Sequence, residues 1–243
     1  MGGHIKRTAK REITINGVAK LHGATYTISP DRNEVVTFAV AAYVTKGDIL
    51  VSDAQKVDLA AFYDALDLVG AKYEMKDNGV RFYFTESLHA TSLQTDIYPG
   101  FMTDWQAPWA VLMTQALGES TIHETVFENK LGYSKDLRKM GANVTLFNPK
   151  VEDPETVYNF NLEDNDPSFF HAIKIVGPKQ LHNAIVTMAD IRAGAAIVLA
   201  ALCANGESSI FGVEKLDRGY EHFEDRMKVL GADIKRVSEE DTK

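Results

Sequence analysis

Three aspartates stand at the starts of three long apolar stretches: Asp31, Asp104 and Asp190. An aspartate just before a helix commonly caps it, because the carboxylate accepts hydrogen bonds from free backbone N–H groups. If the three helices lie parallel, their N-termini meet at one rim, and the positive ends of helix dipoles favour anions there. We therefore expect a polar rim, with each aspartate acting as a cap, as a cleft residue, or as both.

The elements that must position these aspartates recur three times along the chain. In each unit an apolar helix follows the aspartate and ends at Gly-Asp or Gly-Glu. A short strand comes next, and a second helix then ends at Gly-Ala. Such self-similarity is typical of repeat architectures. We predict three helix–strand–helix–strand repeats, at about residues 12–84, 85–150 and 169–237.

The two helices of each repeat differ in composition. The segments "FAVAAYV", "WAVLMTQAL" and "AGAAIVLAAL" are apolar nearly all round, which is typical of buried helices, whereas "HFEDRMKVLG" has one polar face. Strand-like segments are "EITING", "ATYTIS", "GVRFYF", "FFHAIKIVG" and "NAIVTM", and "KDNGV" predicts a hairpin turn. The pattern predicts an α/β fold with three buried parallel helices at the centre and sheets around them.

Residues 151–168 lengthen the interval between the second and third repeats. The stretch "VEDPETVYNFNLEDNDPS" is acidic and contains no Lys or Arg. Its spacing matches no calcium-binding loop, so we interpret it as an inserted surface loop, with a carboxylate metal site as the alternative.

Composition narrows the class of protein. The net charge of −8 argues against sequence-independent binding of nucleic acid, and no apolar run is long enough to span a bilayer. The single cysteine excludes an intramolecular disulfide and fits a reducing, cytoplasmic compartment. The histidines show no metal-ligand spacing and no phosphate-binding glycine loop occurs, so we expect neither a metal nor a cofactor.

The first residues look like the end of a repeat. "MGGHIKR" aligns with "MGANVTL" and "LGADIKR", each of which closes a helix and opens a strand. We expect residues 1–11 to be the tail of a truncated upstream repeat. Residues 12–243 would then form a three-repeat domain that takes its leading strand from "EITING".

Five motifs carry a family resemblance: "TYTISPDRNE", "YPGFMTDWQA", "HETVFENKLGY", "MADIRAGAAIVLAAL" and "LDRGYEHFEDRMKVLGADI". In this order, from about Glu12 to Val237, they resemble the C-terminal half of the UDP-N-acetylglucosamine enolpyruvyl transferases (1-carboxyvinyltransferases). The resemblance implies an inside-out α/β barrel of two three-repeat domains, with the active site in the cleft between them. It also implies the first committed step of peptidoglycan synthesis. In that step the enolpyruvyl group of phosphoenolpyruvate passes to the 3′-hydroxyl of UDP-N-acetylglucosamine, and phosphate is released.

This addition–elimination needs a base at the hydroxyl, an acid for the methylene carbon, and cations around phosphate and carboxylate. By resemblance, Asp104 is the acidic residue at the sugar 3′-hydroxyl, Val126 makes a backbone contact to the nucleotide sugar, and Arg218 clamps phosphoenolpyruvate. The alternative for Arg218 is a surface ion pair with Glu214 or Glu221.

Five further positions are matched with the substrate cleft. Asp31 and Arg32 in "PDR", and Asp190 and Arg192 in "ADIRA", match polar residues that line it. Lys130 in "FENK" stands where the family usually has an arginine; it keeps the charge but loses the two-pronged hydrogen bonding of a guanidinium.

The resemblance also implies what one half cannot supply. The family's mobile loop with its acid, and further substrate-binding cations, belong to the N-terminal domain, so the chain alone should be inactive. Two other functions stay open: a non-catalytic repeat module that binds a nucleotide sugar or a partner, and transfer to shikimate 3-phosphate. "LDRGYE" and "FENK" favour the nucleotide-sugar reaction.

Overall fold

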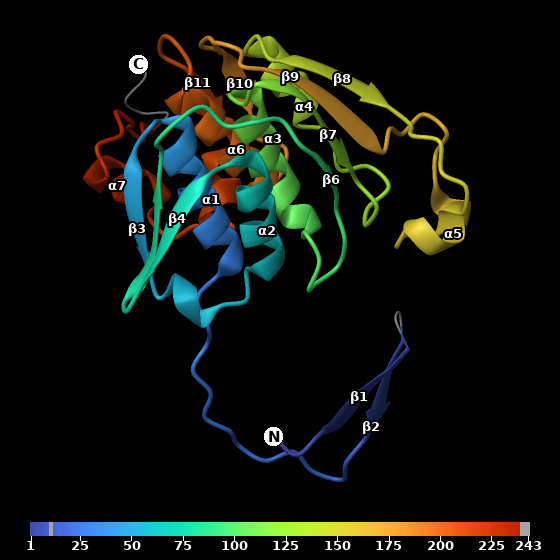
Figure 1. The fold of residues 1–243 in the computed structure, drawn as a ribbon. Helices are drawn as coiled ribbons and strands as arrows, with labels where there is room; N and C mark the ends of the chain where they lie inside the picture. Colours follow the sequence, from blue (N-terminus) through green and yellow to red (C-terminus); the bar gives the residue numbers. More distant parts are fainter. Residues whose placement is uncertain (10–11, 239–243) are drawn as a thin grey trace.

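Three buried helices form the centre of the computed structural model, which describes residues 1–9 and 12–238 (Figure 1). They are α1 (Arg32–Val44), α3 (Gln106–Thr114) and α6 (Ile191–Leu202), and each packs against the other two. Helix α3 is buried throughout, as the apolar composition predicts.

Residues 10–11 of the expected tail and 239–243 of the expected domain lie outside the described residues. No helix within the described residues has the length and hydropathy needed to cross a membrane.

The first two repeats build sheets of the same topology. In the first, the central strand pairs antiparallel with both neighbours, in the order β3-β5-β4. In the second, β9 pairs antiparallel with both β7 and β8, and β6 lies parallel to β7. Strand β9 therefore completes the second sheet, although its residues fall within the range expected for the third repeat. The strands are β3 (Asp48–Ser52), β4 (Lys72–Lys76), β5 (Gly79–Tyr83), β6 (Ser92–Gln94), β7 (Gly118–His123), β8 (Asn143–Phe147) and β9 (Ala172–Gly177).

The second helix of each repeat ends at glycine, as predicted. These helices are α2 (Ala60–Val69), α4 (Ser134–Lys139) and α7 (Phe223–Val229). The glycines that follow, at positions 70, 141 and 231, have φ angles of 79°, 87° and 96°. Only glycine adopts such left-handed angles without strain, so each glycine lets the chain leave the helix and turn back toward the core.

The third repeat is less complete than the sequence predicts. Its strands β10 (Ile185–Thr187) and β11 (Ser209–Phe211) pair in parallel, but residues 232–238 after α7 form no strand. In the other two repeats the corresponding strand pairs with a following one, β5 or β9. No following strand occurs among the described residues here, so residues 232–238 have no neighbouring strand with which to form a sheet.

The segment "EITING", expected to be the leading strand of the first repeat, pairs elsewhere. Strand β2 (Glu12–Asn16) pairs antiparallel with β1 (His4–Ala9), not with the first repeat. All residues of both strands are exposed, and Figure 1 shows this hairpin apart from the helices and sheets. The predicted strand at 24–29 is also absent. A strand forms here only where a local partner is available, so the packed body of the protein begins near Pro30.

The acidic insert lies between β8 and β9, where the first repeat has the two-residue turn Asp77-Asn78. It contains one helical turn, α5 (Pro154–Val157), and a short 3-10 turn (Leu162–Asp164). Most of the insert is exposed, as expected for a surface loop, but Tyr158 and Phe160 are buried.

Candidate active site

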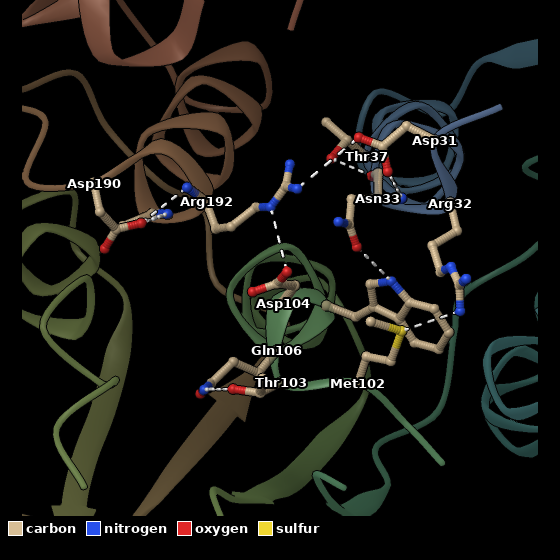
Figure 2. A network of polar contacts seen from close by, with 12 residues as sticks. Asp31, Arg32, Asn33, Thr37, Met102, Thr103, Asp104, Gln106, Asp190 and Arg192 are labelled. Carbon is tan, nitrogen blue, oxygen red and sulfur yellow. Dashed lines mark hydrogen bonds and ion pairs between the residues drawn. The ribbon is translucent and has the colours of Figure 1, made fainter. Parts of the chain in front are cut away.

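Arg192 connects the starts of the three buried helices (Figure 2). From the first turn of α6, its Nε lies 3.7 Å from Oδ2 of Asp104 and its Nη2 lies 3.9 Å from Oδ2 of Asp31. The Arg192 side chain is only 15% exposed, so both ion pairs are partly shielded from water. The expected polar rim therefore exists, and three of the predicted site residues meet there.

The three aspartates do not play equivalent roles. Asp31 accepts a hydrogen bond from the backbone N–H of Asn33 at 2.8 Å, and Asp190 accepts from those of Arg192 and Ala193 at 2.9 Å. Both are therefore helix caps, and Asp31 also faces the shared arginine. Asp104 lies one turn earlier, in a 3-10 turn just before α3, and its carboxylate makes no hydrogen bond within the described residues.

The neighbours of Asp104 fix the backbone that carries it. Thr103 donates its hydroxyl to Oε2 of Glu124 at 2.8 Å, and the indole N–H of Trp105 donates to Oδ1 of Asn33 at 3.0 Å. The Asp104 carboxylate is thus held between two anchored side chains, 31% exposed and free to accept a proton from a hydroxyl.

Glu124 is a component of the site that the sequence reasoning missed. Its side chain is 1% exposed and accepts hydrogen bonds from Thr103, from the amide of Gln106, and from the backbone N–H groups of Val126 and Phe127 at 2.7 and 2.9 Å. Burial raises the pKa of this carboxyl, although the hydrogen bonds oppose the shift. Glu124 thereby joins the turn that carries Asp104 to the loop that follows β7. The sequence did contain a signal for Glu124, because a charged residue that directly follows a predicted strand is a candidate site residue.

Val126 and Lys130 lie in this loop. The N–H of Val126 is taken by Glu124, so a backbone contact to a ligand would use the carbonyl. The ammonium of Lys130 lies 5.1 Å from the centre of the Phe127 ring, a cation–π contact that keeps the charge at the loop surface.

The two other predicted arginines occupy separate surroundings. Arg32 stacks 4.6 Å over the ring of Tyr98, and its Nη1 lies 3.8 Å from the sulfur of Met102, two residues before Asp104. Arg218 ends the 3-10 helix Val213–Arg218 and is exposed. Within the described residues it forms neither of the ion pairs considered from the sequence, so its guanidinium is free to bind an anion.

Tyr220 is a second component that the sequence reasoning missed. It is 1% exposed, shares a hydrogen bond of 2.8 Å with the hydroxyl of Thr37, and lies under the Arg192 guanidinium at 5.4 Å. Burial lowers the pKa of Arg192, but Tyr220 and the two carboxylates outweigh it, so the pKa is raised and the group stays charged. One nitrogen of Arg192, Nη1, is buried without a hydrogen-bond partner in the described structure.

Several bacterial proteins are similar to nearly the whole chain. UDP-N-acetylglucosamine 1-carboxyvinyltransferase of Protochlamydia amoebophila is 36% identical over 241 residues, which are 99% of this chain and 50% of that protein. The protein of the same name from Chlamydia trachomatis serovar D is 38% identical over 96% of this chain and 52% of its own. The chain thus spans about half the length of these relatives.

Comparison of the structure with solved structures, and of the sequence with family models, also finds enolpyruvyl transferases. The enolpyruvyl transferase NikO of Streptomyces tendae superposes with a TM-score of 0.76 at 25% identity, over 96% of this chain and 51% of NikO. The family model for EPSP synthase (3-phosphoshikimate 1-carboxyvinyltransferase) matches residues 1–227. The predicted α/β fold is therefore confirmed, and the chain belongs to the EPSP synthase family.

Proposed function

We propose that this chain is one half of an enolpyruvyl transferase that transfers the enolpyruvyl group of phosphoenolpyruvate to the 3′-hydroxyl of UDP-N-acetylglucosamine and releases phosphate. The observation that carries the proposal is the Asp104 carboxylate, which makes no hydrogen bond to any of the residues that the structure describes. It is partly exposed and lies 3.7 Å from Arg192 at a rim of three helix starts. The names of the relatives support this pair of substrates.

In this proposal each site residue has a distinct task. Asp104 accepts the proton of the sugar hydroxyl as the bond to phosphoenolpyruvate forms, while Arg192 stabilises the charge around it. Arg218 and Arg32 supply cations for phosphate and carboxylate, and the loop with Val126 and Lys130 contacts the nucleotide sugar. The polar lining is completed by Asp31 and Asp190, which also cap the helices that present these groups.

The other half of the site would come from an N-terminal enolpyruvyl transferase domain. A reaction of this kind needs water excluded and the reacting atoms held within about 3–3.5 Å of each other, which one wall of a cleft cannot achieve. The half-length match to the relatives supports this partner. The single cysteine supports a cytoplasmic location.

The first test is phosphate release from phosphoenolpyruvate in the presence of UDP-N-acetylglucosamine. We expect none from the 243-residue chain alone, and turnover when a separately produced N-terminal half is added, a mixture called the assembled enzyme below. A parallel reaction with shikimate 3-phosphate as acceptor should stay inactive. Turnover by the chain alone would contradict the half-enzyme proposal, and turnover only with shikimate 3-phosphate would contradict the acceptor.

Replacing Arg218 by alanine should weaken phosphoenolpyruvate binding by the assembled enzyme. A charge-assisted hydrogen bond contributes about 1.5–3 kcal/mol, so the KM for phosphoenolpyruvate should rise roughly 10- to 100-fold, with the KM for the nucleotide sugar little changed. Arg236→Ala is the matched control, since this exposed arginine is already paired with Asp217 at 2.6 Å. An effect of Arg218→Ala on the nucleotide sugar alone would show that Arg218 is misplaced.

A further inference from the structure

The acidic insert is more than a longer turn. In the first repeat the strands β4 and β5 are joined by two residues, whereas the equivalent β8 and β9 are joined by residues 148–171. Both strand pairs remain in regular register up to their last residues, with Lys76 opposite Gly79 in the first repeat and Phe147 opposite Ala172 in the second. A two-residue turn would therefore suffice for the sheet, and the additional residues are free to serve another purpose.

An aromatic cluster anchors the insert on the end of the second sheet. Tyr158 and Phe160, each 7% exposed, lie 5.1 and 5.2 Å from the ring of His171, and the Tyr158 hydroxyl shares a hydrogen bond of 3.2 Å with Nε2 of His123. Burial lowers the pKa of both histidines, which favours neutral rings that pack well against the aromatic side chains. The middle of the insert is therefore fixed to the body of the protein.

Asn159, between the two anchors, holds two segments of the candidate site. Its backbone N–H donates to the carbonyl of Thr125 at 2.7 Å, and its side-chain amide donates to Oδ1 of Asp96 at 3.2 Å. Thr125 and Thr95 are themselves joined by two hydrogen bonds, of 2.6 and 2.9 Å. Thr125 begins the loop that carries Val126 and Lys130, and Asp96 begins the segment that leads to Asp104.

We propose that Tyr158–Phe160 is a positioning clip, and that it holds the loop 125–130 in the shape that receives the nucleotide sugar. Glu124 holds the backbone N–H groups of Val126 and Phe127 from the body of the protein, and the clip holds the carbonyl of Thr125 from the insert. The start of the loop is therefore fixed from two directions. The ligand in this inference rests on the proposed function, but the positioning of the loop does not.

The test begins with hydrogen exchange of the 243-residue chain without ligand. The double variant Tyr158→Ala/Phe160→Ala removes both anchors, and the amides of residues 125–130 should exchange about tenfold faster or more, while those of α1, α3 and α6 are unchanged. Asn161→Ala is the matched control, because the hydrogen bonds of its side chain, within the described part of the chain, go to Glu163 and Asp164 inside the insert. Unchanged exchange at 125–130 would overturn the clip.

A kinetic measurement then separates the clip from a merely structural role. In the assembled enzyme the double variant should raise the KM for UDP-N-acetylglucosamine several-fold and leave the KM for phosphoenolpyruvate near its original value. Equal changes in both would overturn the assignment of the loop to the nucleotide sugar. If the unaltered assembled enzyme were inactive, the proposed function would fail, and the exchange measurement would still decide the positioning role.

Discussion

Replacing Asp104 by asparagine should leave the chain folded and lower the turnover of the assembled enzyme by about 100- to 10,000-fold, the usual cost of removing a general base. The amide has nearly the same size as the carboxylate, but it cannot accept the proton of the sugar hydroxyl. The surroundings should not rearrange, because Thr103 and Trp105 hold the backbone on either side. Steady-state phosphate release gives the turnover, and a thermal melt checks the fold.

Asp53→Asn is the matched control for this substitution. Asp53 is an exposed residue with a φ angle of 60°, and asparagine tolerates this left-handed conformation as well as aspartate does. Its turnover should therefore match that of the unaltered enzyme. If Asp104→Asn also retained near-normal turnover, Asp104 would not be the base, and the proton would have to be accepted elsewhere.

The sequence predicts the core of this fold because the core is built from strong local signals. The buried helices are apolar on all sides, and glycine marks the end of each second helix in all three repeats. Each unit repeats the same order of elements, so the assignment in one unit supports the assignment in the others. These features depend on neighbouring residues, and neighbouring residues are what a single sequence displays.

Strands that depend on a distant partner are harder to predict. Residues 12–16, 24–29 and 232–238 all have strand-like composition, yet only the first group is a strand, and its partner is β1. Composition shows that a segment can extend, but backbone hydrogen bonding to another strand decides whether it does. Whether such a segment becomes a strand therefore depends on its partner strand, which the composition of the segment itself does not reveal.

The candidate site shows the same division. The aspartates follow from the repeated helix starts and the arginines from the family resemblance. The bridge from Arg192 to both Asp31 and Asp104, however, joins three helices far apart in sequence. The hydrogen bond between Thr37 and Tyr220 spans 183 positions. No spacing rule connects such residues, so these contacts emerge only from the packing of the repeats.

The packing of the three helices leads to the second large effect, on folding. Leu199 lies in α6, is fully buried, and belongs to the hydrophobic core in which the three central helices pack with one another and with the surrounding helices and sheets. Leu199→Lys would place an unpaired charge there, at a cost of several kcal/mol, which is on the order of the total stability of a domain. We expect this variant, and equally Ala196→Asp, to lose the cooperative unfolding transition in circular dichroism.

A lysine introduced on an exposed helix surface separates the effect of burial from that of charge. Val229, in α7, is 88% exposed, so Val229→Lys should change the free energy of unfolding by no more than about 0.5 kcal/mol. The two substitutions add the same charge and differ chiefly in where the ammonium must lie. A cooperative, fully folded Leu199→Lys variant would mean that α6 can turn this position toward water. In that case the three helix starts would not be held together by a common core, and Arg192 would lose the fixed geometry that lets it reach both aspartates.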